Sequence, residues 1–148
     1  MASQGEPAGW DNVAAPRALG TYDDLYAALA AGHPVRSVLR LQGCNGDLLT
    51  DSPQVVGGDV DAMEAFQGGR FGPDVFLGHN FNLLERTSQG YVYQLYEATV
   101  FTNATVAVRV SAVNATTFQG IGASSLVCSL GPAAMSYYDL QARAVASS

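Results

Sequence analysis

The amino-acid sequence predicts a mainly β (α+β) fold: a small antiparallel β-barrel or strongly curved meander with one N-terminal helix. The first observation is a series of segments rich in Val, Tyr, Phe and Thr, at residues 75–85, 91–101, 105–113 and 117–128. Short turn-forming sequences separate these segments, which is typical of antiparallel strands joined by hairpins. The second observation is one helical segment ahead of them. Consecutive strands with a single accessory helix favour a barrel or a curved sheet.

The helix is expected at about residues 21–31. Thr21 is a suitable N-cap, and Asp24 follows it in capping-box register. Leu25 and Leu29 repeat at helical spacing, and Gly32 with the following Pro34 ends the segment.

The other elements are shorter. Residues 35–41 alternate as a strand that ends near Cys44, and residues 45–47 form a turn. Residues 53–58 are interrupted by proline and glycine, whereas residues 61–66 fit a short helical or extended piece. Residues 134–140 are expected to add one more strand.

The chain of 148 residues fits one domain of ordinary size. We expect residues 1–19 to be a flexible N-terminal segment, residues 20–141 a single β-barrel domain, and residues 142–148 a flexible tail. Residues 1–19 lack the basic start and apolar centre of a signal peptide. If the protein is exported, its signal is therefore expected to have been removed and replaced by a short start such as Met1-Ala2-Ser3.

The charge pattern argues against two classes of partner. The formal net charge is −6, and all seven cations are scattered arginines. An acidic chain without a basic face is poorly suited to bind nucleic acid or anionic membranes. No run approaches the roughly 18 apolar residues of a membrane span. The absence of lysine also removes Schiff-base chemistry.

Two pairs of residues favour the secretory route. Asn103 and Asn114 each begin an Asn-Ala-Thr glycosylation sequon at an expected hairpin turn. Cys44 and Cys128 are the two cysteines, and three interpretations of them are open: free thiols, a metal pair or a disulfide. A metal site needs further ligands, and no Cys-x-x-Cys motif is present. A structural disulfide is favoured in an oxidising compartment.

The chain resembles the VirK family, small exported proteins of bacteria with relatives in marine eukaryotes. The similarity extends over roughly residues 20–138, and its motifs are structural rather than catalytic. The resembling segments are Tyr22-Asp23-Asp24-Leu25, residues 30–39 with Cys44, residues 52–66, Gly90-Tyr91-Val92-Tyr93 and the late Cys128. The resemblance implies export, a disulfide and a single VirK-like β-rich domain. It supplies no catalytic residues.

Three residues are candidates for acid–base chemistry. In the strand that starts at Val75, His79 shares a face with apolar residues, so it is expected to point into the barrel. A histidine in an apolar cavity is suited to act as a general base or to orient a ligand, although such residues are more often structural. Glu85 and Glu97 form a catalytic pair if both face inward on neighbouring strands. The alternative is that each glutamate pairs with an arginine.

Aromatic residues supply a possible ligand-binding wall. Tyr91, Tyr93 and Phe101 share one face of their strand, and Phe81 lies on the face of His79. Aromatic walls with polar tips suit a flat, mostly apolar ligand, but they also fill the cores of small barrels.

These observations support three hypotheses. The first is a secreted β-barrel protein that binds a small hydrophobic or aromatic ligand in its interior, without a cofactor or a metal. The second is a cofactor-independent enzyme, such as an isomerase, a cyclase or an oxidative enzyme, that uses the same cavity. The third is a purely structural or interaction protein with a solid core.

Overall fold

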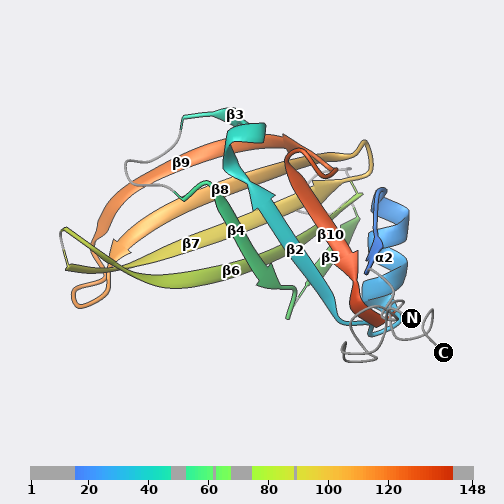
Figure 1. The fold of residues 1–148 in the computed structure, drawn as a ribbon, viewed down its shortest axis with the longest axis horizontal. Coiled ribbons are helices and arrows are strands. Elements are labelled where there is room, and N and C mark those ends of the chain that lie inside the picture. Colours follow the sequence, from blue (N-terminus) through green and yellow to red (C-terminus); the bar gives the residue numbers. More distant parts are fainter. Residues whose placement is uncertain (1–15, 48–52, 62, 68–74, 89, 142–148) are drawn as a thin grey trace, which may run out of the picture.

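Two antiparallel β-sheets and one short helix make up the described part of the chain (Figure 1). The structure is a computed structural model that describes residues 16–47, 53–61, 63–67, 75–88 and 90–141. The mainly β prediction is therefore confirmed, as is the helix near the N-terminus.

The larger sheet has six strands in the order β3-β9-β8-β7-β6-β5. Its centre is the predicted meander, in which each strand pairs with the next through a hairpin. The strands are β3 (Asn45–Gly46), β5 (Glu64–Gln67), β6 (Val75–Thr87), β7 (Gly90–Phe101), β8 (Thr105–Asn114) and β9 (Gly120–Ser129).

The smaller sheet has four strands in the order β1-β10-β2-β4. It confirms the predicted strand after the helix and the predicted last strand. A 3-10 turn, η1 (Leu41–Gly43), leads from this sheet toward the larger one. The strands are β1 (Arg17–Ala18), β2 (Val35–Arg40), β4 (Val55–Asp59) and β10 (Met135–Asp139).

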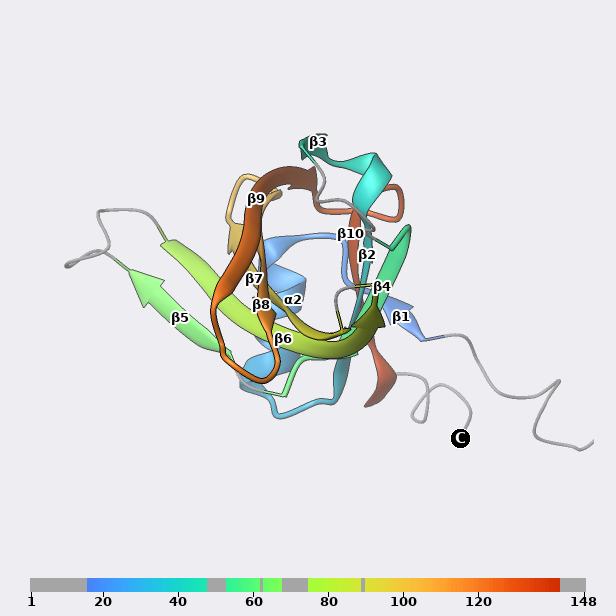
Figure 2. The ribbon, with the colours of Figure 1, turned by 90° about the vertical axis from the view of Figure 1, so that its left-hand side faces the viewer.

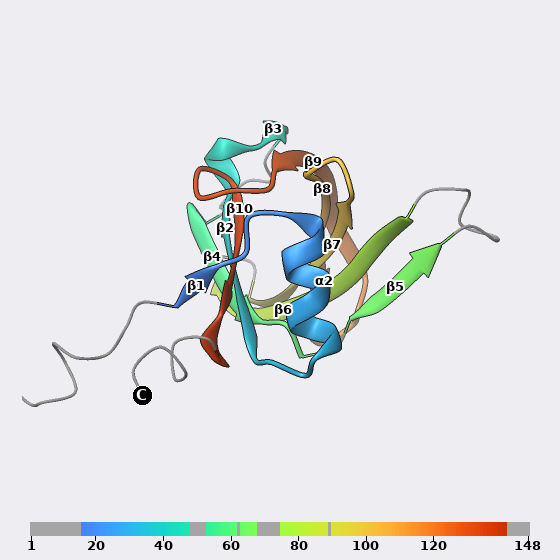
Figure 3. The same ribbon diagram turned by 90° about the vertical axis from the view of Figure 1, so that its right-hand side faces the viewer.

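The helix α2 (Tyr22–Ala30) begins and ends as its sequence predicts. The hydroxyl of Thr21 accepts a hydrogen bond from the backbone N–H of Asp24 at 3.1 Å, which satisfies one N–H of the first turn. Gly32, with φ of +80°, adopts the left-handed conformation that ends the helix. Leu25 and Ala28 are buried, so α2 covers one end of the space between the sheets (Figure 3).

The core lies between the concave face of the six-stranded sheet and the smaller sheet (Figure 2). Alternate residues of the meander strands point inward, as expected for strands with one buried face. The largest fully buried side chains come from both sheets and the helix; they include Leu25, Leu39, Leu77, Tyr96, Val106 and Tyr137.

The closed barrel expected from the sequence is not observed in the described residues. The two sheets remain separate, and no ladder of backbone hydrogen bonds joins β4 to β6. The ring of Phe81 on β6 instead approaches the backbone of β4, where a Cβ on Gly58 would lie 3.4 Å from it. The fold is therefore the curved meander of the prediction, faced by a second sheet.

Part of the segment expected to be a flexible N-terminus is ordered. Arg17 and Ala18 pair with β10, and Leu19 is buried in the core. Residues 1–15 and 142–148 lie outside the described residues.

Candidate ligand-binding site

His79 lies on the inner face of β6, as its sequence position predicts. It is paired across the strands with the small Ala98, and its Nε2 is 2.5 Å from the hydroxyl of Tyr137 on β10. The side chain is almost completely buried, and burial lowers the pKa of His79 to about 4. His79 is therefore a neutral imidazole at neutral pH.

The second ring nitrogen of His79 is an unusual feature of this core. Nδ1 is buried and makes no hydrogen bond within the described part of the chain. Burial raises the pKa of Tyr137, so its hydroxyl keeps its proton and is assigned as the donor to Nε2. That assignment leaves the imidazole proton on Nδ1, a buried donor without a partner.

An aromatic stack extends from His79 along the inner face of the sheet. Phe81 stacks on the imidazole with ring centroids 6.5 Å apart and on Tyr96 with centroids 4.9 Å apart. Phe81 and Tyr96 are direct cross-strand partners, so the pairing of β6 with β7 places these rings together.

A polar chain continues from the stack toward Glu85. The hydroxyl of Tyr96 donates to Gln94 at 2.7 Å, and the amide of Gln94 donates to the carboxylate of Glu85 at 3.1 Å. Burial, and then the charge of Glu85, raise the pKa of Tyr96 to about 12. The Glu85 carboxylate is thus engaged in a structural hydrogen bond.

A groove of about 390 Å³ lies at the seam between the two sheets. Phe81 is a shared wall, since its ring belongs to the aromatic stack and also lines the groove. Polar residues surround it, and one of them, Asp59, pairs with Arg36 at 2.9 Å. The lining residues are Gly57, Gly58, Asp59, Asp61, Asn80, Phe81, Asn82 and Leu83.

Glu85 and Glu97 do not both face inward, as the alternative of a catalytic pair requires. Glu97 is 59% exposed on the outer face of β7, where it lies 3.9 Å from Arg109. Its direct cross-strand partners, Asn80 and Arg109, share that outer face. Glu97 and His79 both border a smaller pocket of about 210 Å³, but their side chains point to opposite faces of the sheet.

The aromatic residues of β7 that were predicted to line the interior also lie on the outer face of the sheet. Tyr91, Tyr93 and Phe101 lie on the outer face, and Tyr91 is 56% exposed. The inner face has Val92, Gln94 and Tyr96 instead. The amide of Gln94 is buried because Glu85 and Tyr96 satisfy it, a compensation that residue polarity alone does not reveal.

Phe81 is the one groove-lining residue that the sequence predicted as a site residue; the others were missed, as was Tyr137. Gly57 and Gly58 were assigned to an irregular segment, yet they form the β4 side of the groove. Tyr137 was placed in a strand, but its contact with His79 bridges 58 positions. The sequence signal for Gly58 is the absence of a side chain, which leaves room for the Phe81 ring against β4.

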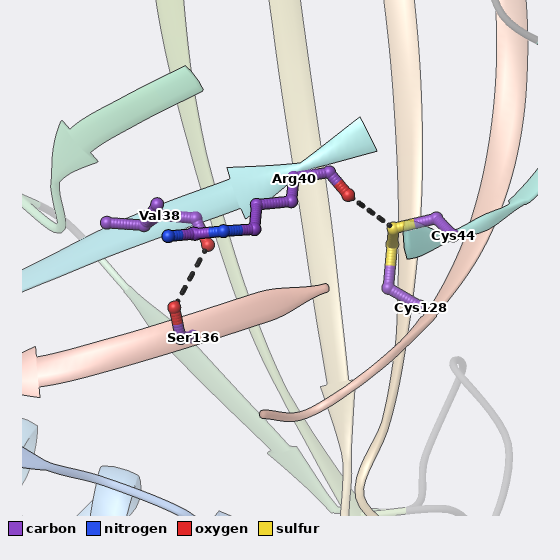
Figure 4. The surroundings of a disulfide bond; sticks show 5 residues. All are labelled: Val38, Arg40, Cys44, Cys128 and Ser136. Atoms are coloured by element: carbon purple, nitrogen blue, oxygen red, sulfur yellow. Dashed lines mark hydrogen bonds between the residues drawn. A yellow bond between two sulfur atoms is a disulfide. The ribbon is translucent and has the colours of Figure 1, made fainter. Parts of the chain in front are cut away.

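The two cysteines form a disulfide, with their Cα atoms 4.4 Å apart (Figure 4). The bridge joins the residue after η1 to β9, and the Cys44 sulfur lies 3.6 Å from the carbonyl oxygen of Arg40. The hydroxyl of Ser136 donates to the carbonyl of Val38 nearby, linking β10 to β2. A disulfide is typical of an oxidising, extracytoplasmic compartment.

His33, in the loop after α2, makes a hydrogen bond with a buried carboxylate. Its Nδ1 is 2.9 Å from Asp139, whose side chain is 1% exposed. Asp139 also accepts from the backbone N–H of Gln141 at 2.9 Å. The contact joins the loop after α2 to the end of β10.

Two negative findings apply to the part of the chain that the structure describes. No three His, Cys, Asp or Glu side chains lie close enough together to hold a metal ion. No helix there has the length and apolar character needed to cross a membrane.

The comparison with solved structures gives one informative similarity. The chain superposes on a VirK family protein from Legionella pneumophila with a TM-score of 0.68, over 82% of this chain and 98% of that chain. The chain has a VirK-like fold. Sequence identity is 14%, so the VirK-like fold is shared although few side chains are. No protein-family model and no curated protein sequence matches the chain.

Proposed function

We propose that this chain is an exported binding protein that holds a small ligand with a flat apolar face in the groove between β4 and β6. The observation that supports this is the position of Phe81, which borders the groove at the seam between the sheets. The volume of about 390 Å³ is within the range of small-molecule sites.

The lining of the groove indicates the chemistry of the ligand. Phe81, Leu83 and the backbone of Gly58 offer an apolar wall for a flat ring. Asp61 and the two asparagines offer carboxylate and amide groups around it. The preferred ligand is therefore an uncharged or cationic aromatic molecule with hydrogen-bond donors at its edge.

The same geometry favours binding over acid–base catalysis. The two predicted catalytic glutamates lie on opposite faces of the sheet, and His79 is neutral and stacked behind Phe81. An enzyme would need a second titratable group beside His79, and the described residues place Tyr137 there with a raised pKa.

A matched pair of glycine substitutions tests the groove. Gly58→Val adds a side chain toward Phe81 at a position without positive φ, so it fills the groove with little backbone strain. Gly120→Ala is the control, since a Cβ there meets nothing within 4 Å. Phe81→Ala removes the wall itself.

Ligand-observed NMR with a library of small neutral and cationic aromatic fragments measures binding. We expect hits for the wild type and Gly120→Ala, and at least a tenfold weaker affinity for Gly58→Val and Phe81→Ala. Fragments that bind Gly58→Val as tightly as the wild type would contradict the proposed site. So would the absence of any hit.

A further inference from the structure

An exposed apolar patch lies on the outer face at the end of the molecule opposite α2. It is formed where the β6–β7 and β8–β9 hairpins turn, at the left-hand tip of Figure 1. We call these residues the tip patch: Leu84, Tyr91, Phe118 and Ile121, with exposed fractions of 55%, 56%, 69% and 46%. Exposed apolar side chains gathered at one end of a molecule favour a partner that covers them.

The glycosylation sequon at Asn114 lies in the turn beside this patch. The side-chain oxygen of Asn114 accepts hydrogen bonds from the N–H groups of Thr116 and Thr117, at 2.8 and 2.9 Å. Both bonds use the carbonyl oxygen, so the turn does not require the amide nitrogen Nδ2. That nitrogen is the atom to which an N-linked glycan is attached.

Backbone hydrogen bonds hold the sequon against two aromatic residues. The N–H of Ala115 donates to the carbonyl of Tyr91 at 3.0 Å, and the N–H of Phe118 donates to the carbonyl of Asn114 at 2.8 Å. Tyr91 and Phe118, whose rings are exposed, are thus both hydrogen-bonded to the sequon through their backbone.

Phe118 is held in an uncommon conformation. Its φ is +60°, a left-handed value that is rare for a bulky side chain and costs free energy. The ring stacks on Tyr93 with centroids 6.4 Å apart and planes 7° apart, yet 69% of the residue is exposed. The turn therefore exposes one face of the Phe118 ring to solvent, while the other face packs on Tyr93.

We propose that Asn114 is an N-glycosylation site and that the first sugar of the glycan covers the rings of Tyr91 and Phe118. A sugar ring has an apolar C–H face that can lie on an aromatic ring while its hydroxyl groups remain in water. The glycan would thus cover the aromatic part of the tip patch without a second protein.

The modification is the usual transfer from a lipid-linked oligosaccharide in the secretory pathway. Nδ2 of Asn114 forms a bond to the anomeric carbon of the first sugar and loses one proton. The bond from that carbon to the lipid pyrophosphate breaks, and the lipid pyrophosphate leaves. The threonine at the third sequon position, Thr116, is exposed, as recognition by the transferase requires.

The sequon at Asn103 provides a control within the same chain. It lies in the β7–β8 turn, where its side-chain oxygen accepts from the N–H of Thr105 at 3.0 Å. The aromatic residue bonded to this turn, Phe101, is half-buried and packs against Phe76 with centroids 5.9 Å apart. Among the described residues, this turn therefore presents no exposed ring to a glycan on Asn103.

The test is to secrete the full chain from a eukaryotic cell line behind a cleavable signal peptide. Thr116→Ala removes the Asn114 sequon and leaves the side chain of Asn114 in its turn, because the Asn114 bonds use backbone N–H groups. Thr105→Ala removes the Asn103 sequon in the same way. Glycopeptide mass spectrometry identifies the modified asparagines, and thermal unfolding gives the Tm of each protein.

We expect Asn114 to be modified and the wild type to melt about 2–4 °C above Thr116→Ala, the shift that one aromatic contact typically gives. Trimming the glycan to its first sugar should retain this gain. The gain should disappear in a Tyr91→Ala, Phe118→Ala background, whereas Thr105→Ala should leave it unchanged. Made without glycans, in a bacterial periplasm, the wild type and Thr116→Ala should melt at the same temperature.

Two results would overturn the proposal. One is secreted protein in which Asn114 is unmodified. The other is a glycan on Asn114 whose gain in Tm survives the loss of both aromatic rings, because the sugar would then lie elsewhere.

Discussion

At the scale of single residues, the core of this fold contains polar groups whose protonation is set by burial. His79 and Tyr137 form a hydrogen bond between the two sheets, and burial moves the two pKa values in opposite directions. Both groups therefore stay neutral over the physiological range. The buried Gln94 has no charge to lose, and its amide is instead satisfied by hydrogen bonds with two side chains.

The buried imidazole predicts a specific dependence of stability on pH. The pKa of His79 is about 4 in the folded chain and near 6.5 in the unfolded chain. Below about pH 6.5 the unfolded state therefore binds a proton that the folded state does not. The free energy of unfolding should fall as the pH falls from about 6.5 to 4, by roughly 3 kcal/mol in total.

Urea denaturation at a series of pH values measures this effect. His79→Gln should lose most of the pH dependence between 4 and 6.5, while the other titrating groups contribute equally to both proteins. Tyr137→Phe is the matched control: it should cost about 1–2 kcal/mol by removing the hydrogen bond but keep the slope. Equal slopes for His79→Gln and the wild type would show that His79 does not titrate as proposed.

At the scale of elements, local sequence determines the helix more directly than any strand. The nine residues of α2 make a helix too short to be stable in isolation, so its cap and its packing face decide whether it forms. The cap comes from Thr21, and the packing face from Tyr22, Leu25 and Ala28.

Thr21→Ala should destabilise the protein by about 1 kcal/mol, because the N–H of Asp24 loses its acceptor. Thr21→Ser should be close to neutral, since a serine hydroxyl accepts the same hydrogen bond. Urea denaturation gives both values, and amide exchange of residues 22–25 localises the loss. An alanine variant as stable as the serine variant would mean that the cap contributes nothing.

Alternation along the strands determines which residues share a face, but not which face is buried. On β6 the sequence predicted both correctly, because its inner face is the more apolar one. On β7 it grouped Tyr91 with Glu97 correctly and then placed this face inward. The error arose because the inner face includes Gln94, whose buried amide is compensated only by contacts made after folding.

Strand β4 shows a second limit of sequence-based prediction. Gly57 and Gly58 weaken any local tendency to form a strand, so the sequence indicated an irregular segment at residues 53–58. Pairing with β2 makes the segment a strand, and this contact depends on the arrangement of the whole chain. The groove was therefore missed, although Phe81, one of its walls, was predicted.

At the scale of the whole molecule, two open sheets take the place of the barrel that the meander suggested. One consequence is that the seam between β4 and β6 is held by side chains rather than by a ladder of hydrogen bonds. A groove at such a seam can be shaped by a few residues without disturbing either sheet. Two of the crossings of the chain between the sheets, near Cys44 and after β9, lie at the disulfide.

The disulfide should therefore stabilise the arrangement of the two sheets. It closes a loop of 84 positions, for which the chain-entropy model gives about 4.5 kcal/mol. A reduced wild type and a Cys44→Ala, Cys128→Ala variant should both unfold at much lower urea concentration than the oxidised wild type. The double variant should not respond to reductant, which separates loss of the bridge from any other effect of reduction. If oxidised and reduced proteins unfolded at the same urea concentration, packing of the core alone would hold the sheets together.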